Sequence, residues 1–181
     1  MYYRRKILLS LLQIFDNELE KISLQKLLML FANLQTKPDY HFVPFKFGCY
    51  SFQANADLST MVKYCQVAEE GNFWKKTDKA DYIAELKESD RRALRAVKNL
   101  YSEKSQDELI RITYLKYPYF AVNSTIVHEV LNEAEYQIVV KSRPEHSTTI
   151  LFTIGYEGVS LEEYLNKLIL NDIRVLCDVR K

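Results

Sequence analysis

Cysteine and histidine are scarce in this sequence, and their spacing excludes two common kinds of site. There are three of each, the cysteines never form a Cys-x-x-Cys pair, and the histidines lie far apart without ligand spacing. The residues are Cys49, Cys65 and Cys177, and His41, His128 and His146. We therefore expect a reducing cytoplasm, no structural disulfide, no metal and no cofactor.

The sequence also lacks a long apolar run and an excess of charge of one sign. Its longest apolar runs, such as residues 7–9 and 27–32, are far too short to span a bilayer, and no signal-peptide pattern follows Met1. It has 25 Lys and Arg against 24 Asp and Glu. We expect a cytoplasmic protein without a membrane role. With 181 residues, 48% of them hydrophobic, it can form one substantial core or two small ones.

Apolar spacing predicts two helices at the start of the chain. The first covers residues 3–15, and the second begins after Ser23, a natural N-cap, and ends before Pro38. Residues 42–52 are dense in aromatic side chains and interrupted by Pro44, which predicts an extended segment packed over the helix pair.

A third helix and a ribbon complete this region. The helix is predicted over residues 53–68 and ends near Gly71, and the ribbon over residues 72–77 and 81–83. Its expected inward residues are Leu58, Met61, Val62 and Cys65, and its expected outward residues are Gln53, Asn55, Ser59, Thr60 and Lys63. Three helices followed by a ribbon is the order of a winged helix-turn-helix.

Two uses of such a domain remain open, duplex DNA binding and protein contact. In the first, outward residues of the third helix read base edges and basic residues contact phosphates. The candidate residues are Arg4, Arg5, Lys6, Gln53, Asn55, Lys63, Lys75 and Lys76. Residues 1–84 hold 11 Lys and Arg against 9 Asp and Glu, a net charge of +2. Because DNA readers usually show a distinctly basic face, this balance favours protein contact or a scaffold.

The rest of the chain divides at a polar linker. Residues 85–141 are predicted to be helical, with a capping box at Ser105 and Glu108 and one helix marked by Val127, Leu131, Ala134 and Ile138. Residues 142–147 have the polarity and the proline of a linker.

The last segment predicts the start of a parallel α/β unit. A strand over residues 150–154 leads through a turn to a capping box at Ser160 and Glu163, a crossover helix, and a second strand that ends at the C-terminus. Glycines and a helix start at the end of a parallel strand favour anions such as phosphate. The candidate ligand-binding residues are Gly155, Tyr156, Gly158, Asp178 and Arg180. Alternatively, Asp178 and Arg180 pair with backbone amides or with each other. We expect Cys177 to point into the core, opposite to Asp178.

Two motifs in this segment carry a resemblance. Residues 150–158, Ile-Leu-Phe-Thr-Ile-Gly-Tyr-Glu-Gly, followed by Asp178-Val179-Arg180, resemble the start of the bacterial family catalogued as domain of unknown function 488. Longer members of that family also resemble this chain at residues 24–28 and 42–52. The family continues with a Pro-x-Ser element and further strands, so the resemblance implies an α/β domain truncated here. It implies no settled activity.

The predicted fold class is therefore α+β in four parts. These are a winged-helix-like domain (1–84), a helical region (85–141), a linker (142–147) and the truncated start of an α/β domain (148–181). The predicted function is a DNA- or protein-recognition module joined to a ligand-binding or enzymatic domain. We expect no catalysis from this chain, because the strands that would wall a pocket are missing. The alternative is a structural or interaction module that completes its sheet by self-association. We expect the chain to form a homo-oligomer through residues 148–181, because an exposed parallel edge is a template for a second chain.

Overall fold

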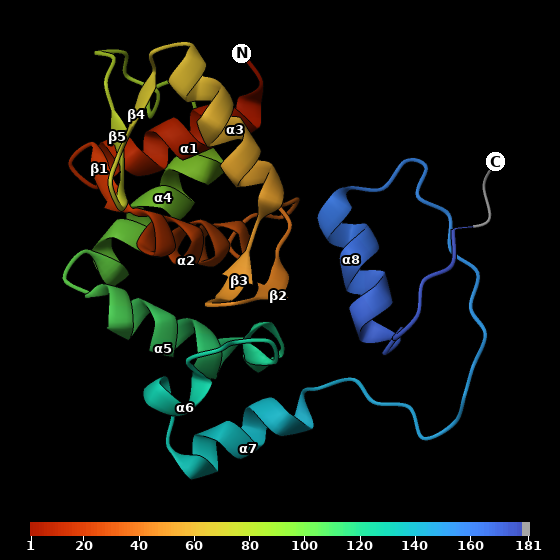
Figure 1. The fold of residues 1–181 in the computed structure, drawn as a ribbon. Coiled ribbons are helices and arrows are strands. Elements are labelled where there is room, and N and C mark those ends of the chain that lie inside the picture. Colours follow the sequence, from red (N-terminus) through yellow and green to blue (C-terminus); the bar gives the residue numbers. More distant parts are fainter. Residues whose placement is uncertain (179–181) are drawn as a thin grey trace.

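The structure, a computed structural model, describes residues 1–178 (Figure 1). It combines helices with short antiparallel strands, so the chain is α+β as predicted. Among the described residues, no helix is long and apolar enough to cross a membrane. Arg180, a predicted ligand-binding residue, lies outside the described part.

Two helices and a strand open the chain. Helix α1 spans Tyr3–Ile14, strand β1 spans Glu18–Glu20 and helix α2 spans Lys21–Ala32. The first predicted helix is confirmed. The second begins before Ser23, so the predicted cap is wrong, because the unpredicted strand β1 leads directly into α2. Residues 23–32 are all buried, which makes α2 the central helix of the core.

The aromatic segment forms a hairpin that leads into the third helix. Strand β2, Val43–Phe45, pairs antiparallel with strand β3, Gly48–Tyr50. Helix α3 then spans Phe52–Lys63. The predicted extended segment is confirmed, and α3 is shorter than predicted.

Side chains from two helices fix this hairpin. The Lys26 ammonium of α2 donates to the backbone carbonyls of Phe47 and Cys49, and burial lowers the pKa of Lys26. Gly48 has a φ of 89°, and a Cβ there would lie 2.5 Å from a ring carbon of Tyr114. The turn therefore requires glycine.

A three-stranded antiparallel sheet, ordered β1–β5–β4, packs beside the helices (Figure 1). Strand β4 spans Val67–Glu70 and strand β5 spans Phe73–Lys76. The predicted strand at 72–77 is confirmed, whereas residues 81–83 form no strand. Because Gly71 turns the chain with a φ of 56°, the partner of β5 precedes the glycine instead of following residue 77.

The middle region is helical, as predicted. Its elements are α4 (Glu88–Tyr101), α5 (Gln106–Lys116), the 3-10 helix η1 (Pro118–Ala121), α6 (Val127–Val130) and α7 (Glu133–Lys141). The capping box of Ser105 and Glu108 is confirmed. The single helix predicted from Val127 onward is two, because Asn132 caps a new helix at α7. One core runs from Ile7 to Leu109, so the predicted boundary after residue 84 falls inside it.

The C-terminal segment forms only the helix of its predicted unit. After α7 the chain makes a wide loop without helix or strand and returns as α8, Leu161–Leu170, beside β2 and the start of α3 (Figure 1). The capping box of Ser160 and Glu163 is confirmed. Residues 150–154 and 173–178 form no strand in the described chain. Two strands and one helix leave too much surface uncovered to be stable alone.

This outcome also changes the environment of Cys177. Its thiol is exposed, so the prediction of a core cysteine is wrong. Without a strand, no regular alternation turns that side chain toward a core.

Candidate recognition site at helix α3

Helix α3 has a fixed start. Ser51 is its N-cap, and the Ser51 hydroxyl accepts from the Ala54 N–H at 3.2 Å. The Ser51 N–H donates to the side-chain carbonyl of Gln25 at 2.8 Å, and the Gln25 amide returns a bond of 3.3 Å to the Ser51 carbonyl. Because Gln25 belongs to the buried helix α2, α3 is held at a defined position on the core.

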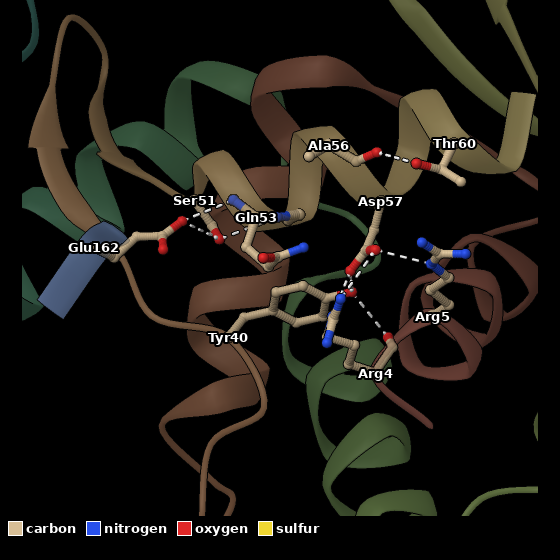
Figure 2. Close-up of polar contacts among 10 residues, drawn as sticks. Arg4, Arg5, Tyr40, Ser51, Gln53, Ala56, Asp57, Thr60 and Glu162 are labelled. Atoms are coloured by element: carbon tan, nitrogen blue, oxygen red, sulfur yellow. Dashed lines mark hydrogen bonds and ion pairs between the residues drawn. The ribbon is translucent and has the colours of Figure 1, made fainter. Parts of the chain in front are cut away.

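A carboxylate from the far end of the chain completes this start. One oxygen of Glu162, in α8, accepts from the Gln53 N–H at 2.7 Å and from the Ser51 hydroxyl at 3.2 Å (Figure 2). The Glu162 side chain is buried. First-turn N–H groups have no acceptor within their own helix, and they favour a negative charge. Sequence reasoning missed this contact, because Gln53 and Glu162 lie 109 positions apart.

The inner side of α3 carries a buried acid. The Asp57 carboxylate accepts from Arg4 Nε at 2.6 Å and Arg5 Nε at 2.8 Å, and the Tyr40 hydroxyl lies 3.1 Å away (Figure 2). Burial alone raises the pKa of Asp57, but the bonds from the two arginines outweigh it and hold that pKa below its ordinary value. This network fastens α3 to α1. Helical spacing from the inward Ala54 and Leu58 could have indicated Asp57 as inward.

The outer side of α3 is small and polar. Its exposed residues include Gln53, Ala56, Ser59 and Lys63, which confirms three of the predicted outward positions. The others, Asn55 and Thr60, are half-buried, and the Thr60 hydroxyl donates to the Ala56 carbonyl at 2.8 Å (Figure 2).

The inward prediction holds in part. Leu58 and Met61 are buried and Val62 is half-buried. Cys65 is exposed, because the helix has already ended and the chain turns there with a φ of 55°.

Three aromatic rings, which we call the ring triad, lie at the start of α3. They are Phe45, Tyr50 and Phe52, and their ring centroids are 5.0 to 5.5 Å apart. Phe45 is 37% exposed and the other two are half-buried. Because Phe52 is the first residue of α3, the triad continues the outer surface of that helix onto the hairpin.

The cations predicted to contact DNA are paired with carboxylates. Arg4 and Arg5 bind Asp57, and Lys6 binds Glu85 at 2.6 Å.

The lysines of the β4–β5 ribbon are also paired with carboxylates. Lys75 binds Glu70 at 2.7 Å and Glu18 at 3.3 Å. The Lys76 ammonium lies 2.9 Å from Asp78, and its side chain is only 3% exposed. Lys63 is the one predicted cation for which the described residues provide no ion pair.

Acidic side chains lie around the predicted anion site. Gly158 turns the chain with a φ of 72° just before the cap of α8, but Glu162 and Glu163 occupy the first turn of that helix. The Ser160 N–H donates to Glu163 and lowers the pKa of that carboxyl. Asp178 is exposed in an irregular segment. Within residues 1–178, no cluster of His, Cys, Asp and Glu side chains could hold a metal ion.

Comparison with known proteins identifies no family for this chain. No family model matches the chain, and no match is found among curated proteins or solved structures.

Proposed function

We propose that this chain is a protein-recognition module of winged-helix-like architecture, with α3 and the ring triad as its contact surface. The observation that carries the proposal is the ring triad, a group of aromatic side chains that stay partly exposed at the start of α3. Aromatic residues are enriched in the cores of protein interfaces, whereas Lys, Asp and Glu are depleted there. The exposed small residues of α3 leave room for a partner to approach the helix closely.

The element order supports the architecture. Three helices precede the β4–β5 ribbon, and β1 joins that ribbon to give the order β1–β5–β4. The β2–β3 hairpin stands between the second and third helices and brings two of the three rings.

Duplex DNA is the second candidate partner, because Gln53, Ser59 and Lys63 are exposed on one helix. Against it, five of the six predicted cations already bind carboxylates. Phosphate contacts by Lys and Arg supply essentially all non-specific DNA affinity, and here those side chains would first have to leave their partners.

A photoreactive amino acid at Ser59 tests this proposal in cells of the source organism. We expect covalent capture of a protein from Ser59 and none from Arg92, an exposed control position on α4. Capture of DNA would favour the second candidate, and no capture from Ser59 would contradict both.

We also propose that residues 148–178 belong to an α/β unit of the family catalogued as domain of unknown function 488. The turn at 155–158 and the capped helix α8 support this, and ligand binding there depends on pairing of the two predicted strands. Titration with inorganic phosphate, followed at the amides of Gly155 and Gly158, tests the site. Unchanged amide resonances would contradict it.

Self-association is a further candidate, supported by apolar exposure in the same segment. Leu151 is 93% exposed, Val175 is 78% exposed and Leu176 is 56% exposed. A second copy could cover these side chains and complete the sheet, which would make the chain a non-enzymatic homo-oligomer.

A further inference from the structure

Helix α8 contacts the rest of the molecule through an unusual side chain. Its one fully buried residue is Glu162, a carboxylate, while Leu161 and Leu170 are more than half exposed. A surface helix normally buries its apolar stripe against a core. Leu165, Leu168 and Ile169 are only half-buried, so polar contacts contribute much of what positions α8.

These contacts come from one face of the helix. Glu162 and Asn166 are four positions apart and so lie on the same side. Asn166 donates to the Phe42 carbonyl at 2.7 Å and accepts from the Tyr119 hydroxyl at 2.9 Å. Together the two side chains hold α8 to the start of α3, to the residue before β2 and to η1.

The small number of contacts favours reversible docking. Each hydrogen bond contributes only modestly to stability, those to the charged Glu162 more than those of the neutral Asn166. The tether over residues 142–160 contains no helix or strand, and short flexible tethers give effective concentrations of about 1 mM. A few polar bonds on such a tether hold α8 in place, but much more weakly than a buried apolar face would.

We infer that α8 is a detachable cover of the start of α3, at the edge of the contact surface beside the ring triad, held there in cis by Glu162 at the Gln53 amide. This inference depends on the proposed function, since it describes how one edge of that same surface, the start of α3, is closed and opened. A protein partner opens it by presenting its own carboxylate to the first-turn amides of α3 and apolar groups to the ring triad. Because the capping box is internal to α8, its release breaks no hydrogen bond of that box.

The test uses the full chain and a defined peptide. The variant Glu162→Ala with Asn166→Ala releases α8, and Glu157→Ala is the matched control, because Glu157 is exposed in the same segment. The probe is a synthetic peptide of residues 158–171, together with the same peptide carrying Glu162→Gln. The readout is hydrogen exchange at the Gln53 amide, with the Leu58 amide reporting that α3 remains folded.

We expect at least tenfold faster exchange at Gln53 in the double variant and unchanged exchange in the control. Adding the unmodified peptide at about 1 mM should restore Gln53 protection in the double variant, and the peptide with Glu162→Gln should restore less. Equal Gln53 exchange in the double variant and the wild type would overturn the inference. So would a failure of the unmodified peptide to restore protection, or loss of Leu58 protection, which would make α8 part of the core.

Capture from Ser59 separates this inference from the proposed function. A several-fold higher yield in the double variant than in the control supports both. Equal yields overturn the cover while the recognition function stands. No capture from Ser59 in the unmodified chain contradicts the recognition function, and the regulatory role of α8 falls with it.

Discussion

Apolar side chains form a buried core in residues 1–141 but remain exposed or half-buried in residues 142–178. In the first part, leucines such as Leu8 and Leu28 are completely buried. In the second, Leu151 and Leu161 are 93% and 54% exposed, and the one buried side chain is the carboxylate of Glu162. The first part therefore has its own source of stability, whereas the second completely buries no apolar side chain and depends largely on polar contacts for its position.

The largest effect should come from matched leucine truncations in the two parts. Leu28→Ala removes a fully buried side chain from α2, and we expect the free energy of unfolding to fall by about 2 to 5 kcal/mol. Leu161→Ala, in α8, should change it by less than about 0.5 kcal/mol. Urea denaturation of both variants measures the difference, and similar losses would show that α8 belongs to the main core.

The next effect concerns the acid inside the first part. Asp57→Asn keeps the shape of the side chain but removes its charge. We expect the free energy of unfolding to fall by roughly 1 to 3 kcal/mol. The lower end is expected because the side chains of Arg4 and Arg5 remain 31% and 17% exposed.

This variant also predicts a pH dependence. The folded pKa of Asp57 is lowered, so its contribution is present above the unfolded value of roughly 3.9 and is lost as pH falls through the folded pKa. Denaturation of the wild type and of Asp57→Asn, measured from neutral to strongly acidic pH, should show that their difference in free energy of unfolding decreases as pH falls. A constant difference would contradict the ion-pair network.

Several elements of both parts could be predicted because their signals are local. The apolar spacing of α1 and the Ser-x-x-Glu pattern at Ser105 and Ser160 depend on neighbouring residues, and all three are confirmed. Strands β1 and β4 were missed because they are short and take their identity from pairing with β5. The Glu162 contact has no local signal at all.

In the second part, strands were predicted that do not form. Residues 150–154 have the apolar, β-branched composition of a strand, yet they form none in the described chain. Strand propensity reflects how well side chains pack on a sheet. Without neighbouring strands, it does not make a segment form a strand. The helix α8 forms where predicted because its capping box satisfies its own first turn.

A smaller effect is expected on self-association. Leu151→Asp with Val175→Asp should shift any oligomer toward monomer in sedimentation velocity, with the free energy of unfolding unchanged within about 0.5 kcal/mol. Tyr64→Asp, at a 69% exposed position in the first part, is the matched control and should leave the oligomer unchanged. An equal shift in both would place the contact outside the C-terminal segment.

The smallest effect is expected on DNA. Lys63→Ala should leave duplex binding as weak as in the wild type at about 50 mM salt, as should the exposed control Lys79→Ala. Measurable wild-type binding, with a salt slope reduced by about one unit in Lys63→Ala alone, would favour the DNA candidate.

Residue-resolved hydrogen exchange of the unmodified chain tests the central claim most directly, that α8 opens independently of the core. We predict that the amides of residues 165–170 and of Gln53 exchange through an opening several kcal/mol easier than the opening that exposes the amides of Leu27 and Leu28 in α2. A single free energy of opening shared by α8, Gln53 and α2 would contradict the account.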